Sequence, residues 1–386
     1  MKVSRIYRNG LLLCILVLPS FGLASVSPGA ELSLRLFRAL AKQSESENFV
    51  FSPFAIRAAL GIAAFGAKGN THKELGKPPE LWTQKKDPSY KLVFANRLWV
   101  DLKYPLLPDF MEASDKALGV RPWMVDFSKA PDFLSDRING WVEERTQGKI
   151  KNVISYDSIN NNSKMLLNSA VYFKGDWVSP FVRNQTSPDS FTSNSGDKFQ
   201  VDYVHRSGNF LYYKGHDFQI LDLPYLDGEI ALSILLPNSV KGLGTLENSL
   251  KPEALDHWLS ELVLKQVEIA LPKFEFDSSL ELTEILKSFG INDPFDSQRA
   301  DFSGMTGSRN LYIDRVTHKT SIALTEEGTE ALGSAVSVDR SIASTQEDTV
   351  PFHANRPFII LIRHRATNSP LFIGHVLRPT ESRQSP

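Results

Sequence analysis

The chain has 386 residues, of which 42% are hydrophobic and 23% are charged, and its formal net charge is -1. A net charge that is not positive argues against general affinity for nucleic acid or for anionic membranes, and no basic stripe interleaved with aromatic residues is present. No linker, charge block or internal repeat divides the chain, despite a length that would ordinarily suggest two domains. We therefore expect one domain over residues 25–386, and a monomer.

The first 24 residues have the pattern of a secretory signal peptide. Three basic residues, Lys2, Arg5 and Arg8, precede an apolar run at residues 11–17, and small residues end the segment at Ala24. The apolar run is too short to span a bilayer. We expect cleavage after Ala24 and secretion to the extracellular space, which changes the net charge from -1 to -4 because the three basic residues are lost.

Cysteine, histidine and motif content exclude most catalytic chemistry. The only cysteine, Cys14, lies within the predicted signal peptide, so the mature protein has no thiol and no disulfide. None of the eight histidines has the spacing of a metal site, and no G-x-S-x-G elbow, phosphate-binding loop or dinucleotide-binding glycine motif is present. We expect no metal, no cofactor and no enzymatic activity.

Two Asn-x-Ser/Thr triplets, at Asn161 and Asn184, are candidate glycosylation sites. They fit a secreted glycoprotein, although such triplets also arise by chance.

Helical patterns dominate the first half of the chain and strand patterns the second. Apolar residues at helical spacing cover residues 32–40, and residues 51–65 predict an alanine-rich, largely buried helix. Residues 267–276 alternate between apolar and polar side chains, which predicts a half-exposed strand. Further strands are predicted at residues 231–236, 358–363 and 371–374, which are apolar enough for a sheet covered on both faces. This order fits a mixed α+β architecture.

A strip of small uncharged residues, led in by acids, runs from Glu326 to Ala335. As a strand, it would place Thr329, Ala331, Gly333 and Ala335 on one face, and that face could enter a sheet without burying a charge. Its composition taken alone is more typical of a flexible linker.

Eight motifs, in order over residues 31–379, resemble the serpin family. In the first half they are residues 48–53 (NFVFSP), 66–71 (GAKGNT), 146–150 (TQGKI) and 168–177 (NSAVYFKGDW). In the second half they are residues 302–305 (FSGM), 318–319 (HK), 354–358 (ANRPF) and 369–374 (SPLFIG).

The resemblance implies the serpin fold, with about nine helices around three β-sheets and an exposed reactive centre loop at about residues 326–350. It also implies the family's activity, inhibition of serine proteases as a suicide substrate. The protease would be trapped as an acyl-enzyme when the cleaved loop inserts into the central sheet. The loop hinge would comprise Glu326, Glu327, Gly328, Thr329, Glu330, Ala331, Leu332, Gly333, Ser334 and Ala335.

Two bonds compete as the reactive bond. The loop spacing common in the family counts 17 residues from Glu326 and places the bond between Ile342 and Ala343, which suits an elastase-like pocket. The bond between Arg340 and Ser341 would suit a trypsin-like pocket that holds a carboxylate. Arg340 is also consistent with an ordinary solvated loop charge. The expected partner is therefore a serine protease, either trypsin-like or elastase-like.

The positions that match the family's sheet-opening cluster are Ser52, Asn168 and His318, with Trp177 near the point where the loop inserts. Without the resemblance, a lone buried histidine is more typical of a core residue with satisfied hydrogen bonds. Ala55 stands where the family usually has a serine, so the cluster lacks one hydroxyl.

The segment from His72 to Val93 is shorter than is usual in the family, and it contains Pro78, Pro79 and Pro88. We therefore expect the family's helix D to be reduced to a turn or lost. That helix carries the heparin site of some relatives, so heparin activation through it is not expected here.

The rival function is that of a non-inhibitory serpin, acting as a carrier, storage or interaction protein. Non-inhibitory relatives tend to have charged, bulky or proline residues in the hinge, and this chain largely does not. The hinge sequence therefore favours inhibition.

Overall fold

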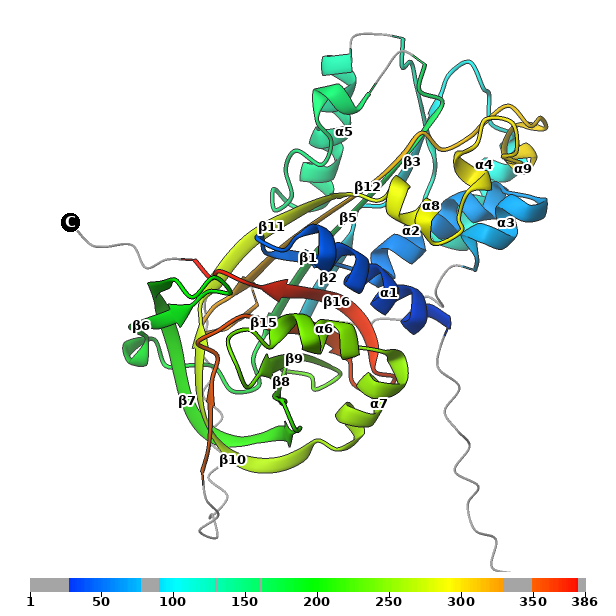
Figure 1. Ribbon diagram of the computed structural model, residues 1–386. Coiled ribbons are helices and arrows are strands. Elements are labelled where there is room, and N and C mark those ends of the chain that lie inside the picture. The colour runs from blue at the N-terminus through cyan, green and yellow to red at the C-terminus, as the bar shows by residue number, and fades with distance from the viewer. Residues whose placement is uncertain (1–27, 78–89, 129–130, 160–161, 330–348, 381–386) are drawn as a thin grey trace, which may run out of the picture.

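The computed structural model describes residues 28–380 apart from residues 78–89, 129–130, 160–161 and 330–348. The described residues form nine α-helices and sixteen β-strands, arranged as two hydrogen-bonded sheets with helices packed between and around them (Figure 1). The mixed α+β architecture expected from the sequence is confirmed. Within these ranges, none of the helices is long and apolar enough to cross a membrane.

The seven-stranded sheet, called the central sheet below, contains the segment expected to open. Its strands are β2 (Tyr90–Phe94), β3 (Arg97–Asp101), β4 (Trp123–Val125), β5 (Met165–Asp176), β11 (Phe274–Glu281), β12 (Arg315–Leu324) and β13 (Gly328–Thr329). β5 pairs antiparallel with β3 through residues 165–168 and with β2 through residues 171–175, and it pairs parallel with β12. β11 and β4 form the two edges of the sheet.

The second sheet has nine strands. They are β1 (Phe49–Phe51), β6 (Ser187–Thr192), β7 (Lys198–Lys214), β8 (Phe218–Pro224), β9 (Ile230–Pro237), β10 (Val263–Pro272), β14 (Val350–His353), β15 (Phe358–His364) and β16 (Ser369–Val376). The resemblance implies three sheets, whereas hydrogen bonding among the described residues gives two. The 17-residue β7 pairs with β6 near its start, with β8 near its end and with β10 between them. This long strand therefore joins β6, β8 and β10 in one sheet.

The predicted N-terminal helical stripe lies on α1 (Pro28–Gln43), where Leu34, Phe37 and Leu40 are buried. Residues 51–65 correspond largely to α2 (Pro53–Gly66), which begins with a proline after the capping residue Ser52. α2 packs against β3 and β5 of the central sheet and against β16 of the other sheet, so it lies between the two sheets.

Helix α5 (Pro131–Arg145) packs on the other face of the central sheet, as the upper part of Figure 1 shows. Ile138 and Val142 of α5 share a buried cluster with Trp99 of β3 and Leu166 of β5. Even-numbered residues of β5 therefore face α5, while odd-numbered ones such as Leu167 face the core around α2.

The remaining helices are short and lie at the periphery. They are α3 (Gly69–Leu75), α4 (Pro108–Leu118), α6 (Leu243–Ser249), α7 (Pro252–Ser260), α8 (Thr283–Ser288) and α9 (Ser303–Thr306), with 3-10 turns η1 (Tyr156–Ser158), η2 (Arg183–Gln185) and η3 (Asp293–Phe295). The region expected to lack helix D lies largely outside the described residues, between the end of α3 and the start of β2.

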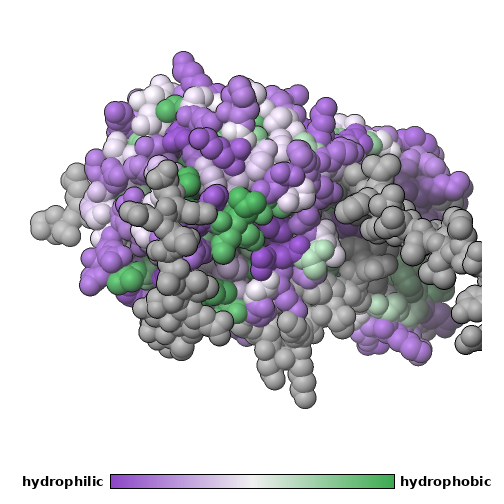
Figure 2. Space-filling view, turned by 90° about the horizontal axis from the view of Figure 1, so that it is seen from below, coloured by the Kyte–Doolittle hydropathy of each residue, from purple (hydrophilic) through white to green (hydrophobic). Residues whose placement is uncertain are grey.

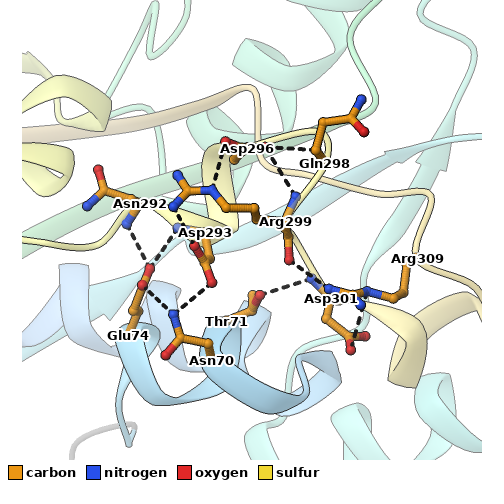
Figure 3. Close-up of polar contacts among 10 residues, drawn as sticks. All are labelled: Asn70, Thr71, Glu74, Asn292, Asp293, Asp296, Gln298, Arg299, Asp301 and Arg309. Atoms are coloured by element: carbon orange, nitrogen blue, oxygen red, sulfur yellow. Dashed lines mark hydrogen bonds and ion pairs between the residues drawn. The ribbon is translucent and has the colours of Figure 1, made fainter.

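A polar network fastens α3 to η3, which lies more than 200 residues later in the chain (Figure 3). The Glu74 carboxylate accepts hydrogen bonds from the backbone N–H groups of Asn292 and Asp293, each at 2.7 Å. The Asn70 side chain donates to both Glu74 and Asp293 at 2.7 Å. Arg299 pairs with Asp293 at 3.1 Å. Glu74 therefore caps the start of η3 and ties the two halves of the chain together.

We expect Glu74→Ala to lower the free energy of the first unfolding transition by about 1.5–3 kcal/mol, because two backbone donors lose a charged acceptor. Urea unfolding followed by circular dichroism measures the change. Glu268→Ala, on the exposed side of β10, is the matched control and should alter stability by less than about 0.5 kcal/mol. Equal effects of the two substitutions would contradict the anchoring role.

Candidate functional site: the hinge and the strands it separates

The hinge begins where β12 and β5 diverge. The two strands pair directly from Arg315 opposite Leu166 to Ser321 opposite Tyr172. Beyond that point β13 lies between them, with Thr329 opposite Leu324 of β12 and opposite Gly175 of β5. The first hinge residues therefore already occupy one end of the gap that a longer strand would fill.

Glycine is required at position 328 because the backbone of β5 lies very close to it. A Cβ atom at Gly328 would lie 2.0 Å from the carbonyl oxygen of Gly175. The contact is with the backbone, which no side-chain rearrangement can relieve, so only glycine fits here.

Thr329 points into the protein and contacts an aromatic stack. Its Oγ1 lies 2.6 Å from Oη of Tyr225, and both residues are buried. The Tyr225 ring stacks on Trp177 with centroids 4.6 Å apart, and Phe173 meets it edge-on at 5.0 Å. Burial raises the pKa of Tyr225, so its hydroxyl stays protonated and able to bond Thr329.

Backbone hydrogen bonds hold the hinge carbonyls. The N–H of Trp177 donates to the carbonyl of Glu327 at 2.9 Å, and the N–H of Phe181 donates to the carbonyl of Glu326 at 2.7 Å. The indole Nε1 of Trp177 donates to the carbonyl of Thr325 at 3.2 Å. These contacts involve main-chain oxygens, so they depend on chain position more than on hinge side chains.

The two acids of the hinge are paired. The Glu326 carboxylate accepts hydrogen bonds from Lys273 Nζ at 3.0 Å and Thr186 Oγ1 at 2.8 Å. Burial raises the pKa of Glu326, but these hydrogen bonds and the Lys273 charge outweigh it, so the net pKa lies below its usual value. Glu327 pairs with Arg183. The hinge is thus anchored just before the point where it turns inward.

His318 belongs to β12, and its side chain lies on the face of the central sheet that meets the N-terminus of α2. Its Nε2 accepts a hydrogen bond from the backbone N–H of Ser52 at 3.0 Å, so the proton of the neutral ring is on Nδ1, which donates to Ser169 Oγ at 3.0 Å. Burial lowers the pKa of His318 to about 3. A neutral ring therefore links β12, β5 and the N-terminus of α2.

The expected role of Asn168 in this cluster is not what the structure shows. Asn168 is buried, but its amide donates to Thr317. Asn168 and Thr317 occupy the face of the sheet that α5 covers, whereas His318 and Ser169 occupy the opposite face. The residue that the sequence reasoning missed is Ser169, and strand alternation next to His318 is the signal that could have found it.

The remaining predicted sites fall partly outside the described residues. Both candidate reactive bonds, Ile342-Ala343 and Arg340-Ser341, lie there, as do the hinge residues from 330 to 335 and the sequon at Asn161. Asn184 lies in η2 and is exposed, so a glycan could be accommodated there. Within the described ranges, no group of three or more His, Cys, Asp or Glu side chains could hold a metal ion.

Comparisons with known proteins agree with this geometry. The chain matches the profile of the serpin family, described as serine protease inhibitors, over residues 28–379. It is 33% identical over 369 residues to a leukocyte elastase inhibitor of Xenopus tropicalis, covering 90% of this chain and 97% of the relative. It is 32% identical over 376 residues to the leukocyte elastase inhibitor of Homo sapiens, covering 92% and 99%.

Solved structures give the same answer. The chain resembles a serpin of the insect Tenebrio molitor, described as highly specific, with a TM-score of 0.81 and 28% sequence identity over 91% of this chain and 97% of that one. The chain therefore belongs to the serpin family, and the expected serpin fold is confirmed. The family is described as one of serine protease inhibitors, which are not enzymes.

Acid should destabilise the protein through His318. An unfolded histidine titrates near pH 6.5, so between pH 6.5 and 3 the unfolded chain binds a proton that native His318 does not. Native stability should fall by about 1.4 kcal/mol per pH unit from this group as the pH drops below 6.5.

His318→Gln should remove this component of the pH dependence, because glutamine does not titrate. Urea unfolding at pH 7.0, 6.0 and 5.0 measures it, with His257→Gln on the exposed face of α7 as control. An unchanged slope of stability against pH in the His318 variant would show that this ring does not contribute to the acid destabilisation.

Proposed function

We propose that this serpin is a secreted inhibitor of serine proteases that traps its target by inserting the cleaved loop into the central sheet. The observation that carries the proposal is the position of β13 at the point where β12 and β5 separate: Gly328 pairs with β5, and Thr329 pairs with both β5 and β12. Cleavage would free the chain beyond Thr329 to continue in the same direction.

The first steps would be those of an ordinary substrate. The protease serine attacks the carbonyl of the residue before the cut, and the acyl-enzyme ester forms as the peptide nitrogen leaves with a proton. The hinge sequence then matters because Ala331, Gly333 and Ala335 would follow Thr329 on the inward face. Leu332 would point outward and is therefore expected to be tolerated.

Insertion of the remaining loop supplies both displacement and free energy. About 15 residues at roughly 3.3 Å each give a strand of about 50 Å, enough to carry a tethered protease along the sheet. β12 and β5 pair directly with each other over residues 315–321 and 166–172, and a strand inserted between them would form a hydrogen-bonded ladder on both of its sides. The uncleaved fold would thus be kinetically trapped.

The target class follows from the candidate reactive bonds. Ile342-Ala343 favours an elastase-like protease, as inhibited by the leukocyte elastase inhibitors to which the chain is similar. Arg340-Ser341 favours a trypsin-like one. Incubation with elastase, trypsin and chymotrypsin, followed by denaturing electrophoresis and sequencing of the released peptide, decides both the class and the bond.

A detergent-resistant adduct with at least one of the three proteases is the expected result. Cleavage by all three without any adduct would instead support the rival function, a non-inhibitory serpin that acts as a carrier, storage or interaction protein.

Secretion is the second part of the proposal. It rests on the signal-like pattern of residues 1–24, and the family match begins just after that segment, at residue 28. Expression of the full chain in a secreting cell, with N-terminal sequencing of the protein in the medium, tests it. A mature N-terminus at Ser25 is expected, and retention of the full chain inside the cell would contradict it.

Thr329→Arg should abolish the adduct while leaving cleavage intact. A guanidinium at this buried position would displace the Tyr225 contact and cost several kcal/mol to bury unpaired. We expect the fraction of protease in stable complex to fall at least tenfold.

Thr367→Arg, in the exposed turn between β15 and β16, is the control and should form adduct normally. Adduct formation by Thr329→Arg at the rate of the unsubstituted protein would contradict insertion through this position.

A further inference from the structure

The end of the β12–β5 pairing that lies away from the hinge is closed by the side chain of Asp314. Its Oδ2 accepts hydrogen bonds from the backbone N–H groups of Lys164 at 2.6 Å and Met165 at 3.0 Å, at the start of β5. The N–H of Asp314 donates in turn to the carbonyl of Met165 at 2.9 Å. Asp314 directly precedes β12, so these bonds join the two chains where their ladder ends. Asp314 and residues 164–165 are called the clasp below.

The side chain of Lys164 adds a second link between the same two segments. Its Nζ lies 5.2 Å from the centroid of the Tyr104 ring and 5.0 Å from that of Tyr312. It also donates a hydrogen bond to the carbonyl of Asn310 at 3.0 Å. Asn310 and Tyr312 lead into β12, whereas Lys164 leads into β5. Cation–π contacts at exposed sites contribute modestly, and hydrogen bonds to a carboxylate are the stronger kind, so we assign the main hold to Asp314.

The register of the hinge shows where an inserted strand would reach the clasp. Thr329 already pairs with both β12 and β5. Continued without a shift, both pairings place residue 338 beside Arg315 and Leu166, which pair with each other in the closed sheet. The next residue would arrive at the clasp. Both candidate reactive bonds lie only a few residues farther along the chain, so the clasp would be met in the last part of insertion.

We propose that Asp314 is a positioning residue of the inhibitory reaction, and that its release from β5 limits how fast the cleaved loop completes its insertion. The proposal rests on the proposed function, because it needs a loop that inserts. β2 and β3 are hydrogen-bonded to β5, and β4 is hydrogen-bonded to β3, so these strands would move together with β5 when it parts from β12. The clasp bonds cross the gap and therefore have to break.

Loss of the Asp314 carboxylate should weaken the closed sheet without weakening the inserted form. In the closed sheet, two backbone donors would lose a charged acceptor. In the inserted form, the backbone of the new strand would lie beside Met165 in place of Asp314. The barrier to insertion should therefore fall, while the contacts that hold the hinge at the other end of the sheet stay in place.

The clasp lies in the upper part of Figure 1, and Figure 2 views the molecule from its lower end. Among the residues that Figure 2 colours by hydropathy, apolar ones form separate groups on a mostly hydrophilic surface. Such a surface gives a protease little apolar contact outside the loop. The fate of a bound protease would then depend on the rate of insertion, which competes with hydrolysis of the acyl-enzyme.

Hydrogen–deuterium exchange of the uncleaved protein tests the clasp without any protease. In Asp314→Ala, the backbone amides of residues 315–318 in β12 should exchange at least tenfold faster than in the unsubstituted protein, while those of β13 keep their rates. Asp314→Asn, which keeps the shape of the side chain but loses its charge, serves if Asp314→Ala does not fold, and a smaller change in the same direction is expected. Equal exchange rates in the variant and the unsubstituted protein would overturn the clasp.

Asp101→Ala is the matched control. The Asp101 carboxylate also accepts two backbone N–H groups, from Lys103 at 2.8 Å and from Phe127 at 3.3 Å. Both donors follow strands that would move with β5, so these bonds do not cross the gap. The control should leave the exchange of residues 315–318 unchanged.

Reaction with a protease that forms an adduct tests the role in insertion, under conditions in which the unsubstituted protein gives both adduct and clipped product. The clipped fraction should fall at least twofold in Asp314→Ala, because faster insertion precedes hydrolysis of the acyl-enzyme more often, and it should not change in Asp101→Ala. An unchanged clipped fraction in Asp314→Ala despite faster exchange would overturn the proposal. If no protease gives an adduct with any of these proteins, the proposed function fails and this proposal with it, whereas equal exchange rates would remove the clasp alone.

Discussion

The parallel hydrogen bonds between β12 and β5 hold the central sheet closed, and the other features of the site depend on this pairing. The pairing covers residues 315–321 and 166–172 and stops where β13 begins. A third strand can insert only by separating these two. The hinge at one end of the pairing and the His318 contacts along it therefore act on the same event, the opening of the sheet.

The hinge is held mainly through its backbone, whereas two close contacts restrict which residues can occupy positions 328 and 329. Carbonyl oxygens of Thr325, Glu326 and Glu327 are bonded by Trp177 and Phe181, and such bonds tolerate side-chain changes. Gly328 and Thr329 do not share this tolerance, because one meets a backbone oxygen and the other a buried tyrosine.

Much of the fold and part of the site could be predicted from local patterns. The helices at residues 32–40 and 51–65 follow from periodicity, and the order of motifs indicated the family. The single strand predicted at residues 267–276 is wrong, because the chain leaves β10 of the nine-stranded sheet at Pro272 and enters β11 of the central sheet at Phe274. Periodicity does not tell which face of β5 meets α2, so Asn168 was expected where Ser169 lies. Tyr225 could not be found at all, because its partner Thr329 is 104 positions away in the sequence and a tyrosine after a strand has no distinguishing pattern.

The central claim is that the uncleaved protein is a trapped state which gains stability when its cut loop joins the sheet. The most direct measurement compares the thermal melting of the intact protein with that of protein cleaved once between residues 330 and 348. The account predicts that the cleaved form melts at a clearly higher temperature, because the inserted strand replaces the one pairing between β12 and β5 with two pairings, one to each of these strands. Identical melting temperatures of the two forms would contradict it.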